Sequence, residues 1–462
     1  MRQLFGTDGI RGIAGTAPLD TNTVYAVGLA LAHQLRPGAL ATGLVGPKVI
    51  LGRDTRESSP WIAKMLIAGL RAGGAEIESA GVVPTPAIAY LAHTHGFHAG
   101  VVISASHNPW EDNGIKLFGP DGKKLPDQTE LAIEEVIFKH AIETTPPNIA
   151  ELPPLEDQLH YSEEYIASLL AAVPGLRLDG QSIVVDCANG AAAAVVPELF
   201  ASLGGDVTLL NVSPDGRNIN DHCGALHPKT VAAAVVERGA NLGITFDGDA
   251  DRCLFAGSSN NVINGDAILL MAARDLQARG LLTGNVVVAT TMSNMGLEAA
   301  LKRSGITMLR AQVGDRYVLE LMQKQNAALG GEQSGHILFP HLATTGDGLL
   351  TSLVVLDLIA RTGKTVEELT ADLKVFPQVI LNVKVREKKP LEEIPSVAER
   401  IRAAEAELAD SGRVVIRYSG TEALARVMIE AESEIAMQHH AEAIANAIRA
   451  ELGVDPSPSQ VK

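Results

Sequence analysis

Short apolar runs typical of β-strands alternate with helical stretches along most of this 462-residue chain. The pattern occurs three times, and each time the third run leads directly into a polar loop. The runs are 49–51, 75–79 and 100–103; 182–185, 207–210 and 242–246; and 285–289, 306–309 and 327–329. Strands that alternate with helices indicate parallel sheets joined by right-handed crossovers. We therefore predict three similar α/β domains, with mixed, mostly parallel sheets, that present their loops to a central cleft.

Two features divide the chain further. Four prolines between residues 146 and 154 mark the end of the first repeat. After Phe376-Pro377 the pattern changes to a strand at 379–385, an amphipathic helix at 391–408, two more strands and a final helix. This last part indicates a smaller α+β domain. The predicted domains are residues 1–157, 158–256, 257–374 and 375–462.

Three aspartates alternate directly after the apolar run 242–246, at Asp247, Asp249 and Asp251. The carboxyl end of a strand in an open α/β sheet is where ligands bind, and carboxylate oxygens are preferred ligands of hard divalent cations. A calcium loop of the EF-hand type is excluded, because Arg252 and Ser258 stand where that loop needs Gly and Glu. An acidic turn without a ligand remains an alternative. We predict a cation site in which water or phosphate oxygens complete the coordination.

Composition limits the possible partners. The formal net charge is −16, which argues against a general surface for nucleic acid or anionic membranes. An anionic substrate must then be bound by local Arg and Lys clusters. The N-terminus has no apolar signal core, and polar residues interrupt the longest apolar stretch, 349–360. Three scattered cysteines, Cys187, Cys223 and Cys253, form no CxxC pair, so we expect a cytoplasmic protein.

The loop SASHNP at 104–109 brings a serine and a histidine together after the strand at 100–103. Taken alone, it is best interpreted as an ordinary serine-rich turn. A Ser-His-Asp hydrolase is a second interpretation, but no G-x-S-x-G motif surrounds Ser106. In combination with a metal loop, another role fits better. Ser106 could carry a phosphoryl group whose oxygens complete the shell of a Mg²⁺ ion.

Three further loops carry groups suited to a phosphosugar. Arg417, Ser419, Gly420 and Thr421 follow a strand and offer a guanidinium, two hydroxyls and an accessible backbone for a phosphate, although a surface hairpin turn is an equal alternative. The Gly-rich loop at 6–12 contains Arg11. The loop GGEQSGH at 330–336 contributes Glu332, Ser334 and His336, which suit sugar hydroxyls or an amine. No P-loop and no G-x-G-x-x-G motif after a strand are present, so a dinucleotide cofactor is not expected.

Taken together, these loops resemble the α-D-phosphohexomutase superfamily, in order and over essentially the whole chain. The resemblance rests on GTDGIRG at 6–12, SASHNPWEDNGIK at 104–116, FDGDADR at 246–252, VGDRYV at 313–318, GGEQSGH at 330–336 and RYSGTE at 417–422. It implies a mutase that moves a phosphoryl group between two positions of a sugar through a phosphoserine. The loops are most similar to members that interconvert glucosamine 6-phosphate and glucosamine 1-phosphate for amino-sugar and cell-wall precursor synthesis. A mutase acting on glucose or mannose phosphates and a metal-dependent phosphatase are the alternatives.

The resemblance also implies residue roles. Ser106 would be the phosphoserine, and its phosphate would share a Mg²⁺ ion with Asp247, Asp249 and Asp251. Other roles follow from matched positions: Arg11, Lys116 and His107 for catalysis; Arg252 for steadying the phosphate; Glu332, Ser334 and His336 for the sugar; and Arg417, Ser419, Gly420, Thr421 and Arg426 for the non-reacting phosphate. Glucosamine 1,6-bisphosphate or a similar bisphosphate would be intermediate and primer. The expected partners are a phosphorylated amino sugar and, as a candidate, a second copy of the chain; no nucleic acid or membrane is expected.

Overall fold

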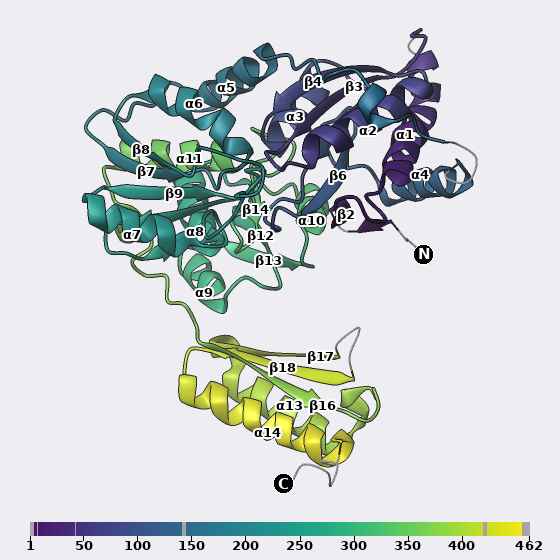
Figure 1. Cartoon of the computed structure of the whole chain (residues 1–462). Helices are drawn as coiled ribbons and strands as arrows, with labels where there is room; N and C mark the ends of the chain where they lie inside the picture. Colours follow the sequence, from purple (N-terminus) through teal and green to yellow (C-terminus); the bar gives the residue numbers. More distant parts are fainter. Residues whose placement is uncertain (1–3, 7, 42, 141–144, 419–422, 455–462) are drawn as a thin grey trace, which may run out of the picture. The chain divides into compact units, whose positions relative to one another are not determined.

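The computed structural model of the chain describes residues 4–6, 8–41, 43–140, 145–418 and 423–454 (Figure 1). The chain divides into two compact units. Unit 1 comprises residues 1–292 and 308–371, and unit 2 comprises 293–307 and 372–462. Unit 1 contains three sheets with most of their helices, and unit 2 contains a fourth, smaller sheet and the helical segment at 295–303. This confirms the predicted α/β fold with a small C-terminal part, whereas the four domain boundaries remain a prediction.

The first sheet has the strand order β1-β2-β6-β5-β3-β4. Its strands are β1 (Phe5–Gly6), β2 (Gly9–Ile13), β3 (Lys48–Arg53), β4 (Glu76–Val82), β5 (Ala99–Ile103) and β6 (Asp112–Phe118). Its helices are α1 (Thr21–Ala41), α2 (Ser59–Ala72), α3 (Thr85–Thr94) and α4 (Asp127–His140). Helices α1 and α2 pack with their backbones in contact, because a Cβ at Gly28 would lie only 2.2 Å from the Leu66 carbonyl oxygen.

The second sheet has the order β11-β10-β9-β7-β8. It consists of β7 (Ser182–Asp186), β8 (Asp206–Leu210), β9 (Leu242–Phe246), β10 (Cys253–Gly257) and β11 (Val262–Ile263), with α5 (His160–Ala172), α6 (Val196–Leu203) and α7 (Pro228–Arg238). The third sheet, β13-β12-β14-β15, consists of β12 (Val286–Thr290), β13 (Thr307–Ala311), β14 (Leu329–Gly331) and β15 (Ile337–Leu338). The helices that follow or interrupt these strands are α8 (Gly265–Ala278), α9 (Met295–Arg303), α10 (Asp315–Gln325), α11 (Gly348–Thr362) and α12 (Val366–Leu369).

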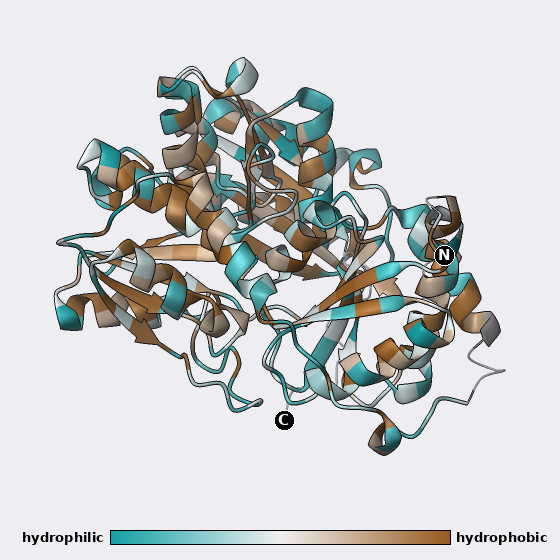
Figure 2. Ribbon diagram, turned by 90° about the horizontal axis from the view of Figure 1, so that it is seen from above, coloured by the Kyte–Doolittle hydropathy of each residue, from teal (hydrophilic) through white to brown (hydrophobic). Residues whose placement is uncertain are grey.

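The same local arrangement recurs in the three sheets of unit 1. Strands β5, β9 and β14 are internal, and every residue in them is buried. Each pairs in parallel with one neighbour (β3, β7, β12) and antiparallel with the other (β6, β10, β15). The serine loop, the acidic loop and the GGEQSGH loop follow the carboxyl ends of these three strands. Figure 2 shows the hydropathy of the whole chain, with brown, hydrophobic residues in many strands and helices and teal, hydrophilic residues in many of the connecting loops.

Unit 2 comprises α9 and an antiparallel sheet covered by two further helices. Its order is β16-β18-β17, with β16 (Gln378–Lys384), β17 (Gly412–Tyr418) and β18 (Leu424–Ala431). Helices α13 (Pro395–Leu408) and α14 (Glu434–Leu452) pack against it around a core that includes Val383, Val427 and Ile444. The predicted helix at 391–408 therefore begins at Pro395; residues 391–393 form a separate 3₁₀ turn. Further 3₁₀ turns lie at Ile149–Glu151, Ala191–Ala194, Thr283–Asn285 and Ala409–Ser411.

None of the helices in the described part of the chain is both long enough and apolar enough to cross a lipid bilayer.

Candidate active site

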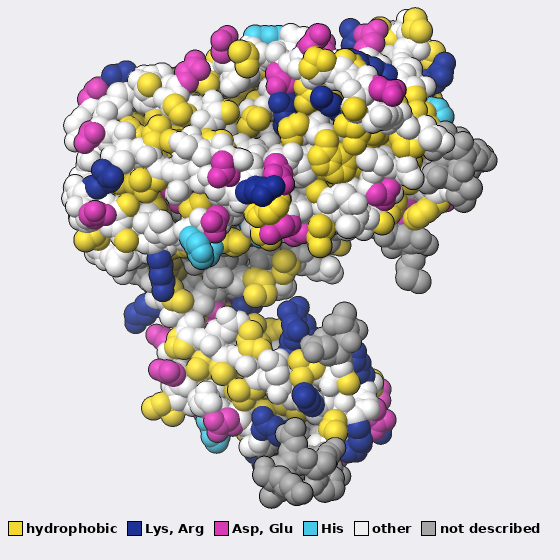
Figure 3. All heavy atoms as spheres, in the orientation of Figure 1, with side chains coloured by type: hydrophobic (Ala, Val, Ile, Leu, Met, Phe, Trp, Pro, Cys, Tyr) yellow, Lys and Arg dark blue, Asp and Glu magenta, His cyan; other side chains and the backbone are white. Residues whose placement is uncertain are grey.

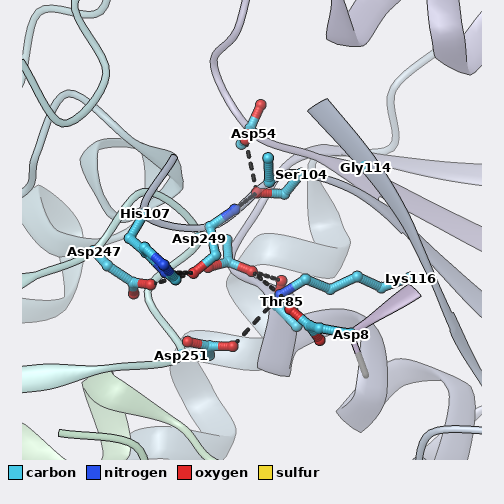
Figure 4. A network of polar contacts seen from close by, with 12 residues as sticks. Asp8, Asp54, Thr85, Ser104, His107, Gly114, Lys116, Asp247, Asp249 and Asp251 are labelled. Carbon is cyan, nitrogen blue, oxygen red and sulfur yellow. Dashed lines mark hydrogen bonds and ion pairs between the residues drawn. The ribbon is translucent and has the colours of Figure 1, made fainter. Parts of the chain in front are cut away.

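The serine loop and the acidic loop meet at the carboxyl ends of β5 and β9. The Ser106 hydroxyl donates a hydrogen bond of 2.6 Å to Asp247 Oδ2, although 141 residues separate the two in sequence. Asp247, Asp249 and Asp251 are all buried, and one oxygen from each lies within 4.8 Å of the others. Figure 4 shows Asp249 and Asp251 near the end of the Lys116 side chain, with Asp247 on the side of His107. The structure thus brings together the serine and the three acids that the sequence singled out.

The three carboxylates have the features of a site that needs a cation. Asp249 Oδ1 and Asp251 Oδ1 are buried and form no hydrogen bond with any described residue. Burial and repulsion by Asp251 and Asp249 raise the pKa of Asp247 to about 8. A divalent cation would reverse this, since it attracts the charged form and takes oxygen ligands. The residues present therefore fit a hard metal ion.

Lys116, on β6, supplies the nearest positive charge. The side chain is 1% exposed, and its Nζ lies 2.7 Å from Asp249 Oδ2, 3.1 Å from Asp8 Oδ2 and 3.5 Å from Asp251 Oδ2. Burial alone would lower the pKa of Lys116, but the three carboxylates raise it above its ordinary value. Lys116 is therefore a permanent cation beside the acidic loop.

The first turn of α3 contacts the acidic loop on its other side. The backbone N–H of Thr85 donates to the Asp249 carbonyl oxygen at 2.9 Å, and the Thr85 hydroxyl donates to Asp249 Oδ2. A helix N-terminus favours nearby negative charge. Thr85 was not predicted from the sequence, where it lies in an unremarkable PTPA segment.

Three more residues continue this charge network into the third sheet region. Lys124 Nζ lies 2.5 Å from Asp8 Oδ1 and 2.7 Å from Asp315 Oδ2. His336 Nε2 lies 3.7 Å from Asp315 Oδ2, and His336 Nδ1 lies 3.6 Å from Asp251 Oδ1. Together with Lys116, these groups form a closed ring in which acids and bases alternate. The ring joins residues that follow or belong to all three sheets of unit 1.

The opposite charges of this ring keep its members ionised although they are buried. Burial would lower the pKa of His336, but Asp251, Asp315 and Glu332 raise it to about 9. Burial would raise the pKa of Asp251, but Lys116 and His336 hold it well below its usual range. Of the residues involved, the sequence analysis missed Asp8, Lys124 and Asp315. Asp8 and Asp315 lie inside the motifs GTDGIRG and VGDRYV, whereas Lys124 carried no signal.

The arginines of the site present unsatisfied donors. Arg11 Nη1 donates to the Ala105 carbonyl oxygen at 3.1 Å, and its Nη2 pairs with Asp8. The Nε atoms of Arg11 and Arg252 are buried and form no hydrogen bond with any described residue. Buried donors without acceptors are costly, so these N–H groups suit the binding of an anionic ligand. Both arginines line a cavity of about 400 Å³.

His107 and the GGEQSGH loop line the same cavity. His107 Nδ1 lies 3.2 Å from Ser106 Oγ, and burial together with Arg252 and Arg11 lowers the pKa of His107 to about 4, so the ring is neutral. Glu332 Oε1 accepts from the Gly314 N–H at 3.0 Å, and Ser334 Oγ donates to Glu332 Oε2 at 3.4 Å. Acidic and basic side chains therefore line one polar cavity, which suits a charged and hydroxylated ligand.

The remaining predicted residues belong to unit 2. Arg417 on β17 and Arg426 on β18 are directly opposite each other in the strand register. Two like charges in this position destabilise a sheet, and an anion bound between them would relieve the repulsion. Figure 3 shows Lys and Arg side chains in dark blue over this end of unit 2. Ser419, Gly420 and Thr421 lie outside the described residues.

Comparison with known proteins assigns the chain to a family. Four regions match the phosphoglucomutase/phosphomannomutase family: alpha/beta/alpha domain I at residues 2–143, domain II at 163–260, domain III at 264–376 and the C-terminal domain at 380–447. The phosphoglucosamine mutase of Koribacter versatilis is 56% identical over 462 residues, covering 98% of each chain. The chain belongs to the phosphoglucosamine mutase family. The resemblance drawn from the motifs is thereby confirmed, and the protein is an enzyme with mutase function.

Solved structures of the superfamily share the fold. A phosphoglucomutase/phosphomannomutase family protein from Burkholderia thailandensis has a TM-score of 0.76 at 24% identity, covering 98% of this chain and 100% of that one. The Aspergillus fumigatus N-acetylphosphoglucosamine mutase, in complex with GlcNAc-6P and magnesium, has a TM-score of 0.59 at 21% identity, covering 97% and 96%. At these identities the likeness concerns the fold.

Proposed function

We propose that this mutase interconverts glucosamine 6-phosphate and glucosamine 1-phosphate through a phosphate carried on Ser106. The observation that carries the proposal is the contact of 2.6 Å between Ser106 Oγ and Asp247, inside a buried group of three carboxylates. A serine held against such a group is suited to carry a phosphate that shares a metal ion with the acids. The unsatisfied Nε–H groups of Arg11 and Arg252 supply donors for that phosphate.

We propose Mg²⁺ as the metal, held by Asp247, Asp249, Asp251 and the phosphate on Ser106. All donors at the site are oxygens, which hard cations prefer, and the Aspergillus enzyme was solved with magnesium. When bound, the ion would supply positive charge next to the phosphoryl group. The rest of the chemistry depends on the protein's own side chains.

These side chains act mainly through charge and position. Apart from the phosphate carried on Ser106, phosphoryl transfer requires alignment of the reacting oxygens and neutralisation of the charge that develops on them. Lys116 stays protonated beside Asp249, so charge stabilisation suits it. Neutral His107 lies 3.2 Å from Ser106 Oγ and is placed to exchange a proton with that oxygen. In the proposed cycle, phosphoserine gives its phosphoryl group to glucosamine 6-phosphate. The resulting 1,6-bisphosphate reorients in the site, and Ser106 then accepts the phosphoryl group from the 6-position.

The amino sugar is the favoured substrate. The relative that is 56% identical is named for it, and Glu332 and Asp315 provide carboxylates on the cavity wall for an ammonium group. Glucose and mannose phosphates are the alternative within the superfamily. With purified enzyme, glucosamine 6-phosphate should be converted far faster than glucose 6-phosphate, and equal or inverted rates would overturn the substrate assignment.

Other residues would bind the parts of the substrate that do not react. Arg417 and Arg426, with Ser419, Gly420 and Thr421, would hold the phosphate that does not react, while Glu332, Ser334 and His336 would contact the sugar. We also propose that the chain is organised in the four predicted domains, with a homodimer as the candidate assembly. The three cysteines are free and buried thiols, which is in keeping with a cytoplasmic location.

The proposal is tested by replacing the nucleophile. Ser106→Ala should abolish mutase activity, whereas Ser202→Ala, at an exposed serine on α6, should keep the wild-type rate. Both variants should have the same circular dichroism spectrum as the wild type. Retained activity in Ser106→Ala would exclude Ser106 as the phosphate carrier.

A further inference from the structure

The backbone at Ser106 has a conformation that serine rarely adopts. Its φ angle is 53°, in the left-handed region, where residues with a Cβ atom are disfavoured. Strain of this kind persists only where the surroundings hold the backbone, and it concentrates at functional sites. The groups that hold the Ser106 peptide therefore decide how its hydroxyl meets Asp247.

Arg56 holds the serine loop from within the first sheet region. Its side chain is fully buried and pairs with Asp54, with 2.8 Å between Nε and Oδ2. Its Nη atoms donate to loop carbonyl oxygens, at 3.0 Å for Ser106, 2.9 Å for Asn108 and 3.0 Å for Asp112. The loop therefore has a rigid support that does not involve the second sheet.

A second contact from the same side fixes the Ser106 amide. Asp54 Oδ2 accepts from the Ser104 hydroxyl at 2.7 Å, and Ser104 Oγ accepts from the Ser106 N–H at 2.9 Å. Figure 4 shows Asp54 and Ser104 in this arrangement. Both ends of the Ser106 residue are thus held by buried groups of the first sheet region.

Asn220 reaches the serine loop from the opposite side. It lies in the segment between β8 and α7, 7% exposed, and belongs to the second sheet region. Its Nδ2 donates to the carbonyl oxygens of Ser106 at 2.9 Å and Asn108 at 3.2 Å. Arg56 and Asn220 therefore both donate to the Ser106 carbonyl oxygen. Of these two residues, Asn220 is the one that belongs to the sheet region carrying the acidic loop.

Gly248 of the acidic loop closes the remaining side. A Cβ at this glycine would lie 2.5 Å from the Ser106 carbonyl oxygen, so the two loops touch through their backbones. At such close approach, a small rotation of the Ser106 peptide would change the distance from its hydroxyl to Asp247. A displacement of about 1 Å between reacting groups can lower a rate by about a hundredfold.

We propose that Asn220 is a positioning residue for phosphoryl transfer, which fixes the serine loop in register with the acidic loop through the Ser106 carbonyl oxygen. Arg56 holds the loop itself, and Asn220 sets its place relative to Asp247. The inference rests on the proposed role of Ser106 as phosphate carrier.

Two substitutions remove the contact in different ways. Asn220→Gly deletes the side chain, and glycine tolerates the φ angle of 58° at this position. Asn220→Asp keeps the shape but replaces the Nδ2 donor by an oxygen that repels the Ser106 carbonyl. Asn211→Gly is the matched control, because Asn211 lies in the same segment with a φ of 51° and donates to Asp186 Oδ1 at 2.9 Å, away from the serine loop.

The measurement is a single-turnover rate of phosphoryl transfer from phosphorylated enzyme to glucosamine 6-phosphate. The rate is expressed per mole of phosphorylated Ser106, determined by intact mass, so that loss of folded protein does not enter. Asn220→Gly and Asn220→Asp should lower it by about tenfold to a hundredfold with the substrate KM changed by less than about twofold. Asn211→Gly should shift Tm but leave this rate within about twofold of the wild type.

A wild-type rate in Asn220→Gly, or a loss no larger than that in Asn211→Gly, would overturn the positioning role. A rise in KM with unchanged kcat would do the same, since it would assign Asn220 to substrate binding. A wild-type enzyme with no phosphate on Ser106 would instead overturn the proposed function and, with it, this inference.

Discussion

Asp247 is expected to reduce the stability of the metal-free protein, because it is buried among like charges. Replacing it by Asn removes an ionisable group. Its pKa is about 8 in the folded state, whereas the ordinary value of 3.8 applies to the unfolded chain. The folded protein binds this proton more tightly than the unfolded chain does. Stability should therefore be lost as pH rises from about 4 to about 8 in the wild type, and Asp247→Asn should not show this loss.

The size of the effect follows from the same values. One pKa unit corresponds to about 1.4 kcal/mol. At pH 7 the unfolded chain ionises this carboxyl while the folded state keeps it protonated, so the metal-free protein is less stable than at low pH by up to about 4 kcal/mol. The Asn side chain keeps a hydrogen bond with Ser106. It weakens the hydrogen bond of 3.2 Å that Asp247 Oδ1 accepts from the backbone N–H of Arg252. Subtracting about 1 kcal/mol for this loss leaves a net stabilisation of about 2–3 kcal/mol at neutral pH.

The assay is thermal unfolding in EDTA at pH 5 and pH 8, followed by circular dichroism. Asp247→Asn should melt several degrees above the wild type at pH 8, with a much smaller difference at pH 5. Asp251→Asn is the control with the opposite sign, since Lys116 and His336 stabilise that carboxylate and its loss should lower Tm. Excess Mg²⁺ should raise the Tm of the wild type only. A lower Tm for Asp247→Asn than for the wild type in EDTA at pH 8 would refute the reasoning.

The charge network and the metal site can each be perturbed separately. Lys116→Met should lower kcat at least about a thousandfold and destabilise unit 1 by about 3–5 kcal/mol, because it leaves buried carboxylates unpaired. Steady-state kinetics and urea unfolding would measure the two effects. A near-normal kcat would contradict the assigned role. His336 has its pKa raised to about 9 in the folded state, so the stability it contributes is complete below about pH 6.5 and lost as pH rises through 9. His336→Gln should therefore lower Tm at pH 6 far more than at pH 10, and a constant difference would exclude an ionic role. Removal of divalent ions with EDTA should abolish activity and Mg²⁺ should restore it, whereas full activity in EDTA would exclude a required metal.

The repeated strand pattern predicted the fold because it reflects local chemistry. The strands β5, β9 and β14 are buried on both faces and read as short apolar runs, so their position and the loops that follow them were visible in the sequence. Strand β6 was missed. It begins Asp112-Asn113-Gly114, residues disfavoured in strands, and is held in place by pairing with β2 and β5.

The site was predictable only where chemistry is concentrated in one motif. Ser106 and the three aspartates lie in compact loops, and the structure brings them into contact. Lys124 and Asp315 pair across 191 positions of sequence, so no local pattern could reveal them. The same holds for Asn220, whose amide contacts a residue 114 positions away. Contacts of this kind depend on how separate sheets pack, and single-sequence periodicity carries no information about that.

Following a labelled phosphate from the enzyme to the sugar tests the central claim most directly. Enzyme labelled with ³²P by a labelled hexose 1,6-bisphosphate would be mapped by peptide analysis and then mixed with unlabelled glucosamine 6-phosphate. We predict that the label resides on Ser106 and passes to the sugar phosphates during turnover. Label that stays on the protein while product forms, or that appears as free phosphate with no labelled sugar, would contradict the account.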